Sequence, residues 1–178
     1  MIINQTYLKK YSPIPLNYNL AEVMNYVGVA EKIWVRPLIG YQLFDEIEQQ
    51  VKNNEVSEAN ATLLTEGGLW QYLSFATVLE ALPLVWAHIN EVGITKGKSD
   101  NSDSLTLKDM TYVSQHLRNQ VEVLKDQLKK WLCEHNAHFP TMDCCACGCS
   151  CCQEHSKLNK PNPNFELYGT PRQCTELR

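Results

Sequence analysis

The chain has 178 residues and a mass of 20.4 kDa, which corresponds to one domain of ordinary size. Hydrophobic residues make up 44% and charged residues 20%, a balance typical of folded globular proteins that excludes a disordered chain. The formal net charge of −4 disfavours a protein that coats nucleic acid, because such proteins carry an excess of Lys and Arg. No Lys or Arg occurs between Lys52 and Lys96, which predicts an acidic end or face.

Targeting and membrane signals are missing from the sequence. Residues 1–6 contain neither a basic region nor a long apolar run, so we expect no signal peptide and a protein that is made and kept in a cytosol. The stretch 67–92 contains only two charged residues, Glu80 and Glu91. Because Glu80 lies near its middle, this stretch is predicted to be a buried helix and not a membrane span.

The first half of the chain is predicted to contain an arm and three helices. Residues 1–19 carry three tyrosines and two prolines without helical periodicity, which predicts an extended N-terminal arm. Apolar residues spaced by three and four predict a helix over 20–35. Pro37 is expected in the first turn of a second helix, and Ser57 is expected to cap a third that ends at Gly67.

Two longer helices are predicted in the second half. Residues 69–92 are apolar nearly all round, so this helix must be covered on several sides, and Pro83 should kink or split it. A polar loop over 93–105 leads to a helix that runs from Thr106 to about Asn136. A seam of about four heptads lies along this last helix: Met110, Ser114, Leu117, Val121, Leu124, Leu128 and Trp131.

The predicted fold class is all-α, a helical bundle with a long C-terminal helix. The bundle occupies residues 20–138, between the extended N-terminal arm 1–19 and a Cys-rich, Pro/Asn-rich C-terminal tail over 139–178. His-Glu-x-x-His and Gly-x-Ser-x-Gly do not occur, and the run 93–99 lacks the spacing of a phosphate-binding loop. We therefore expect no catalytic residues and no enzyme.

The cysteines are the most unusual chemical feature, because six of them fall within nine residues. Two Cys-x-x-Cys pairs, Cys144 with Cys147 and Cys149 with Cys152, each have the spacing of a zinc half-site. We predict that these four thiolates bind one Zn²⁺, the only cofactor expected. The side chains that can replace one of them are Cys145, Cys151, His138 and His155. Since a single residue separates the pairs, disulfides formed in a released particle and a disordered thiol-rich tail stay open as alternatives.

Several packing motifs follow one another in a characteristic order. They are Ala30-Glu31-Lys32-Ile33-Trp34-Val35-x-Pro37-x-Ile39-Gly40, then Gly67-Gly68-Leu69-Trp70-Gln71-Tyr72-Leu73, then Asn90-Glu91-Val92-Gly93-Ile94, and finally Asp109-Met110-Thr111-Tyr112-Val113 at the start of the last helix. This order resembles small helical proteins encoded in the structural-gene blocks of crAss-like bacteriophages and related prophages. Those proteins are similar to the head-to-tail connector, or ring, proteins of tailed phages. The resemblance covers about residues 12–138.

The resemblance implies a structural virion protein that forms an oligomeric ring, twelve-fold, beneath the portal. The implied partners are copies of the same chain, the portal protein and neighbouring connector or tail rings. DNA would only pass through the channel, no membrane would be involved, and the protein would reside in the virion after assembly in the host cytoplasm. An acidic channel would repel DNA and let it slide. The alternative function is a zinc-binding interaction or regulatory module built on the cysteine tail.

Overall fold

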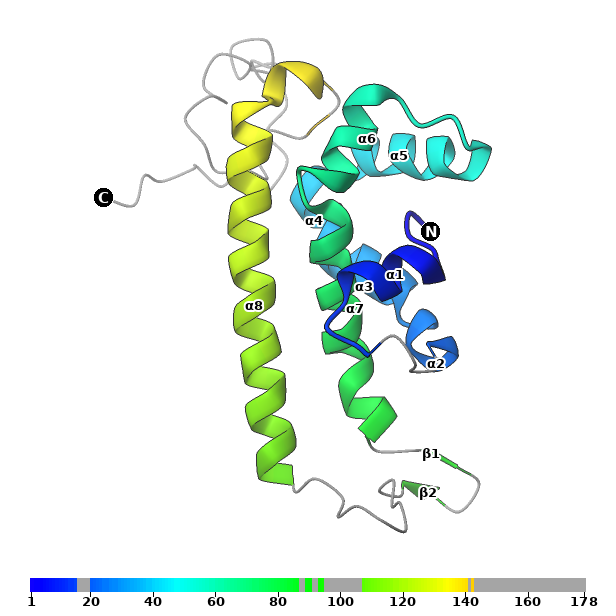
Figure 1. Ribbon diagram of the computed structural model, residues 1–178, viewed down its shortest axis with the longest axis vertical. Helices are drawn as coiled ribbons and strands as arrows, with labels where there is room; N and C mark the ends of the chain where they lie inside the picture. Colours follow the sequence, from blue (N-terminus) through cyan, green and yellow to red (C-terminus); the bar gives the residue numbers. More distant parts are fainter. Residues whose placement is uncertain (16–19, 87–88, 91–92, 95–106, 141, 143–178) are drawn as a thin grey trace, which may run out of the picture.

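A computed structural model of the chain describes residues 1–15, 20–86, 89–90, 93–94, 107–140 and 142. This part is mostly helical, which confirms the predicted all-α class (Figure 1). The helices are α1 (Gln5–Tyr11), α2 (Ala21–Met24), α3 (Val27–Ala30), the π-helix η1 (Glu31–Val35), α4 (Arg36–Ile39), α5 (Tyr41–Asn53), α6 (Glu58–Thr65), α7 (Leu69–Trp86), α8 (Leu107–Glu134) and the 3₁₀-helix η2 (Asn136–His138). Two short strands, β1 (Ile89–Asn90) and β2 (Gly93–Ile94), pair antiparallel.

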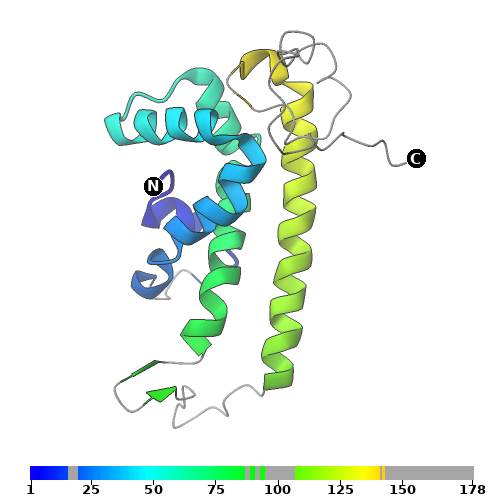
Figure 2. The ribbon, with the colours of Figure 1, turned by 180° about the vertical axis from the view of Figure 1, so that it is seen from behind.

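Helix α7 lies at the centre of the molecule. Helix α8 packs along one side of it, and α1, α2, α3 and η1 cover much of the rest, with the run from η1 to α4 crossing α7 toward α8 (Figures 1 and 2). Helices α5 and α6 lie at the end of the molecule where α8 finishes (Figure 1). The strands β1 and β2 lie at the opposite end, beyond the end of α7 (Figure 1).

The predicted burial of α7 is confirmed. Its buried side chains are Leu69, Trp70, Tyr72, Leu73, Ser74, Ala76, Thr77, Val78, Leu79 and Ala81, which point in all directions around the helix. The Thr77 hydroxyl donates to the Leu73 carbonyl (2.8 Å), so this polar group is satisfied inside its own helix. No helix of the described residues is both long and apolar enough to cross a membrane.

The predicted C-terminal end of this helix is wrong. Helix α7 continues past Pro83 without a split, ends at Trp86, and is followed by strand residues at 89–90 where the sequence predicts helix to residue 92. Proline removes one backbone N–H donor, and its ring crowds the preceding turn. Both effects weaken the helix around Pro83, and α7 ends three residues later. The apolar pattern does not reveal this end, because Ile89 and Val92 suit a strand as well as a helix.

The seam predicted on the last helix is confirmed. Leu117, Val121 and Leu128 are buried, and Leu132 continues their line beyond the predicted heptads. Leu124 and Trp131 are partly buried against the same core. Because these residues recur every three or four positions, one face of α8 packs on α7 and the opposite face is exposed. The core also includes Phe139 and Met142, which follow η2.

The extended arm predicted for residues 1–19 is wrong for the segment that the structure describes. Residues 5–11 form helix α1, and the side chains of Ile2, Ile3 and Leu8 are buried in the core. The Asn4 side chain accepts a hydrogen bond from the Tyr7 N–H (2.9 Å) and caps the helix. The segment is an integral part of the fold because its apolar side chains cover α7.

Two polar contacts and one aromatic stack fix this N-terminal segment. The Ile2 N–H donates to the buried Glu31 carboxylate (2.7 Å), and the Trp70 indole N–H donates to the Ile2 carbonyl (2.9 Å). The Tyr7 ring stacks on Trp70 with 3.9 Å between the ring centroids. These partners lie 29 and 68 residues away in the chain, so local sequence patterns carry no sign of them.

The single helix predicted over residues 20–35 is divided into several short helices. Asn25 and Tyr26 form a turn between α2 and α3, and both are weak helix formers. Pro37 lies in the first turn of α4, as predicted, but α4 ends at Gly40, whose φ of 85° is left-handed. Helix α5 therefore begins after this glycine, and it buries the predicted Leu43, Phe44 and Ile47.

The third helix follows the prediction. Ser57 caps α6 by accepting a hydrogen bond from the Asn60 N–H (3.3 Å). After α6 the chain turns at Gly67, where a Cβ atom would lie 2.7 Å from the Leu63 carbonyl oxygen and 3.0 Å from the Trp131 ring. The absence of a side chain at Gly67 thus lets the end of α8 approach the turn before α7.

We predict that Leu117→Ala lowers the free energy of unfolding by about 2–5 kcal/mol, because it removes buried atoms from the α7–α8 contact and leaves a cavity. Arg118→Ala, at the exposed neighbouring position, is the matched control and should change stability by less than about 0.5 kcal/mol. Urea unfolding followed by circular dichroism measures both. Equal stabilities of the two variants would contradict the packing of α8 described above.

We predict a similar loss of about 2–5 kcal/mol for Leu8→Ala, since this side chain is fully buried. Gln5→Ala, which changes an exposed residue at the start of α1, should be close to neutral. Urea unfolding followed by tryptophan fluorescence is suited to this test because Trp70 contacts the segment. If both variants unfold like the wild type, the N-terminal segment is a detachable arm after all.

Candidate subunit interface

The predicted zinc ligands lie almost entirely outside the described residues. Cys144, Cys147, Cys149 and Cys152 are in this group, as are the substitutes Cys145, Cys151 and His155. The remaining substitute, His138, is exposed at the end of η2. Within the part of the chain that the structure describes, no three His, Cys, Asp or Glu side chains gather as a metal would require.

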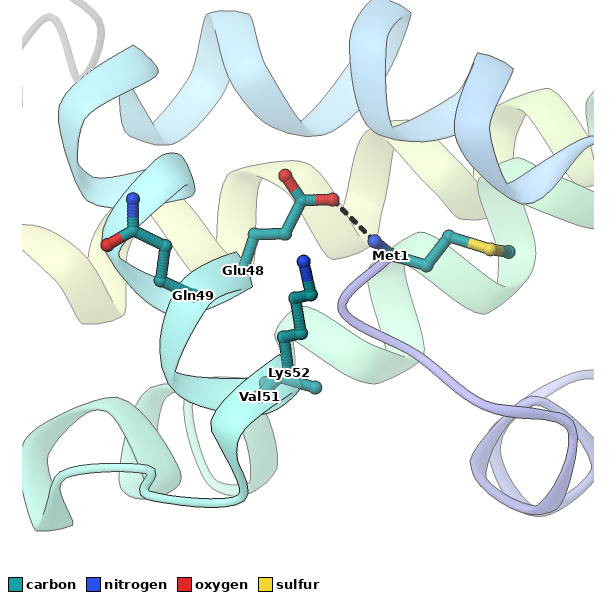
Figure 3. A pocket seen from close by; sticks show the side chains of 5 residues that line it. All are labelled: Met1, Glu48, Gln49, Val51 and Lys52. Atoms are coloured by element: carbon teal, nitrogen blue, oxygen red, sulfur yellow. Dashed lines mark hydrogen bonds and ion pairs between the residues drawn. The ribbon is translucent and has the colours of Figure 1, made fainter.

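A hollow of about 510 Å³ lies beside α5 and is lined by Met1, Glu48, Gln49, Val51 and Lys52 (Figure 3). The Met1 ammonium donates to the Glu48 carboxylate, and this hydrogen bond lowers the pKa of Glu48. Gln49 points away from Met1, so the lining groups do not converge on one point (Figure 3). Met1 and Glu48 form an ion pair that attaches the N-terminal segment to α5.

The most deeply buried carboxyl group also has a structural partner. Glu31 is 5% exposed, and burial raises the pKa of its carboxyl group, while the hydrogen bond from the Ile2 N–H acts in the opposite direction. Nearby, the Trp34 indole N–H donates to Glu80 (2.9 Å), and the Tyr72 hydroxyl donates to the Trp34 carbonyl (3.2 Å). These contacts connect η1 to α7 and to the N-terminal segment, so they serve the packing of these elements.

The exposed apolar side chains distinguish the surface of this molecule more clearly than the polar groups described above. Seven large hydrophobic side chains are exposed in the described part of the chain. Six of them fall on two stretches of the chain. Tyr112, Val113 and Val123 lie on α8, and Val29, Ile33 and Tyr41 lie in the run from α3 to the start of α5. Single exposed apolar residues are common on soluble proteins, but groups that recur at helical spacing indicate a contact surface.

The first of these surfaces, which we term the α8 face, lies on the outer side of α8 and reaches the edge of the buried seam at Val113 and Gln120. Its members are exposed and carry no formal charge with His neutral: Tyr112, Val113, His116, Asn119, Gln120 and Val123. Tyr112 and Val123 are 75% and 57% exposed, although the same helix buries Leu117, Val121 and Leu128 on another side. Between Asp109 and Glu122 the only charged side chain of α8 is Arg118. Absence of charge combined with an exposed aromatic ring is typical of the centre of a protein interface.

The second surface, which we term the ridge, consists of Val29, Ile33 and Pro37. These exposed residues are four positions apart, and Ile33 is 54% exposed. The π-helix η1 has more residues per turn than an α-helix, so a spacing of four keeps its members on one side. Tyr41 follows beyond Gly40, and its ring lies 6.0 Å from the Arg36 guanidinium. The inward side of the same segment carries Val27, Ala30 and Val35 into the core.

The end of the molecule formed by α5 and α6 is acidic. From residue 41 to residue 66 the chain carries six acidic side chains and one basic side chain, Lys52. Asp45, Glu55, Glu58 and Glu66 are exposed. Asn60 joins the two helices, because its side-chain amide donates to Glu46 (3.0 Å) and to Gln50 (2.8 Å). The acidic region that the sequence predicts is therefore concentrated at one end of the described structure.

Sequence reasoning did not identify the α8 face or the ridge. The heptad pattern on α8 does show that its other side is exposed, and the missing charges between Asp109 and Glu122 are readable in the sequence. The ridge had no such signal, because Val29 and Ile33 lie within an apolar pattern that predicts burial. Only the packing of Val27, Ala30 and Val35 on α7 decides which side of this segment faces outward.

The chain belongs to DUF6712, a family of unknown function, whose model matches residues 35–152. This match spans about two thirds of the chain, from the end of η1 through α8 and into the cysteine block. Comparisons with curated proteins and with solved structures found no match. The family therefore gives no activity, and the function has to be argued from the surfaces of the subunit.

We predict about one zinc per chain in protein purified under reducing conditions, because four thiolates at this spacing suit a tetrahedral site. Elemental analysis measures the metal, which acid should release as the thiolates are protonated. Changing Cys144, Cys147, Cys149 and Cys152 together to Ser should abolish it, whereas Cys133→Ser on α8 should retain it. Six reactive thiols without metal would favour a flexible tail, and six blocked thiols without metal would favour disulfides.

Proposed function

We propose that the protein is a structural subunit of a bacteriophage virion, and that copies of it form a ring, twelve-fold, in the head-to-tail connector. The ring joins the portal to the tail and leaves a channel for DNA. The observation that carries the proposal is the pair of exposed apolar surfaces on a subunit whose core is otherwise well filled. A subunit of this kind completes its burial of apolar side chains only against neighbours.

The proposal also draws on the order of packing motifs that resembles connector proteins. The residues of those motifs have structural roles in this chain: Trp34 and Tyr72 connect η1 to α7, and Trp70 holds the N-terminal segment. Such contacts make a rigid subunit, which suits an assembly that must keep a fixed channel. The N-terminal segment is not free to act as an arm between subunits, because α1 is packed in the core, so ring contacts in this proposal come from helix faces.

The acidic end supports a channel for DNA. With six acidic side chains and one basic side chain, the α5–α6 region repels phosphates. A surface that faces passing DNA has to avoid binding it, since each Lys or Arg contact to a phosphate adds affinity. We therefore assign the α5–α6 end to the channel side of the ring, where the repulsion keeps DNA sliding.

A zinc-binding interaction or regulatory module is the second candidate function. It rests on the two Cys-x-x-Cys pairs, which fall within the part of the chain that the family model matches. The two functions differ in what they require of the helices. A zinc module needs the cysteine block and uses the helices only as a scaffold, whereas a ring needs the exposed helix faces.

We predict that the purified chain assembles into particles with about twelve times the 20.4 kDa subunit mass. Mass photometry over a range of concentrations measures the mass, and negative-stain electron microscopy shows whether the particles are rings with a central hole. Removing the metal with a chelator should leave the rings intact if helix faces make the contacts. A chain that stays monomeric at every concentration would contradict the proposed function.

A further inference from the structure

We propose that the ridge of one subunit docks on the α8 face of the next, so that copies of this chain associate head to tail. This inference rests on the proposed ring function and specifies which surfaces make its contacts. The occupant of each surface is a second copy of the same chain. The argument depends on where the two surfaces lie, on how their shapes match and on the charges beside them.

The two surfaces belong to different elements of the molecule. The α8 face lies on α8, and the ridge lies on the run from α3 through η1 to α4, which crosses α7 (Figures 1 and 2). The α8 face points away from α7, since the seam that includes Leu117 and Val121 fills the inward side. The ridge also points away from α7, because Val27 and Ala30 fill its inward side. One subunit can therefore contact two neighbours at once, one with each surface.

This arrangement distinguishes a head-to-tail contact from a symmetric dimer. In a two-fold dimer the same surface meets itself, which would leave the other surface uncovered. A contact between two different surfaces covers both in every subunit, and it closes into a ring when the rotation between neighbours divides a full turn. The presence of two different apolar surfaces on one subunit thus favours the head-to-tail arrangement over self-pairing.

The dimensions of the two surfaces are compatible. At about 1.5 Å per residue, the α8 face extends for roughly 16 Å from Tyr112 to Val123. The ridge from Val29 to Pro37 extends for roughly 12 Å on the same basis. A row of small and branched side chains spaced by four residues fits beside a helix whose exposed residues are also spaced by three and four. The exposed Tyr112 ring, at one end of the α8 face, supplies a large aromatic side chain of the kind that interfaces bury.

Charges at one edge of the two surfaces are complementary, whereas Arg118, beside Asn119 of the α8 face, has the same sign as Lys32. Lys32 is exposed next to Ile33 on the ridge, and Asp126 is exposed three residues after Val123 on α8. When the ridge lies against the α8 face with Ile33 near Val123, these opposite charges lie at the edge of the contact. Edge charges of opposite sign steer association and fix the register, whereas a self-paired ridge would bring Lys32 against its own copy.

The test uses two variants that each destroy one surface. Tyr112→Ser with Val123→Asp disrupts the α8 face, and Ile33→Asp disrupts the ridge. We expect each variant alone to be monomeric by mass photometry. An equimolar mixture should form a dimer and nothing larger, because the intact ridge of the first variant can dock on the intact α8 face of the second. Gln49→Asp adds the same charge at an exposed site on α5 and should assemble like the wild type.

The outcomes separate this inference from the proposed function. Circular dichroism first establishes that the variants keep the helical content of the wild type, as changes at exposed positions should. If the wild type forms rings but the ridge variant alone still self-associates, or the mixture stays monomeric, the head-to-tail pairing is overturned and the ring function stands. If the wild type itself never assembles, the proposed function and the inference are both overturned.

Discussion

The fold depends on the need to cover α7 on every side. This helix has buried side chains around its whole circumference, and the elements that cover it come from opposite ends of the chain: α8 along one side, and α1, α2, α3 and η1 around the rest. Burial of a Leu or Phe side chain stabilises the fold by about 1.5–3 kcal/mol. Each helix that brings apolar side chains to α7 is therefore held there by the burial of those side chains. The polar contacts around α7, such as Trp70 to Ile2 and Trp34 to Glu80, then fix the orientation of the covering elements.

The parts of this arrangement that the sequence predicts are those with a long, one-sided apolar pattern. The heptads of α8, the apolar face of α5 and the Ser57 cap are all local features, so spacing alone identifies them. The N-terminal segment escapes prediction because Ile2, Ile3 and Leu8 form no repeat. Their burial depends on Trp70 and Glu31, which are distant in the chain. The division of residues 20–35 is likewise a product of packing on α7, which overrides the periodicity of three and four.

The candidate interface was even harder to predict, because it consists of side chains left over after the core is filled. Val29 and Ile33 follow the same apolar pattern as Val27 and Ala30, and only tertiary packing separates the outward pair from the inward pair. The α8 face is easier to recognise once the seam is known, since its lack of charge between Asp109 and Glu122 is unusual for the exposed side of a helix. A helix face that meets only water usually carries charged as well as polar side chains. In the proposed ring, the missing charges would be the sequence signal for the neighbouring subunit.

The position of the acidic end relative to these surfaces bears on whether one subunit can serve both a ring and a channel. The ridge and the α8 face lie on the sides of α7, whereas α5 and α6 lie at one end of the molecule (Figures 1 and 2). Lateral contacts through the sides leave Asp45, Glu55 and Glu58 outside the interface, where burial of unpaired carboxylates would be costly. Repeating the acidic end around a ring would concentrate negative potential at the channel, so that DNA passes without binding. Subunit contact and DNA repulsion are thus assigned to separate parts of the same short chain.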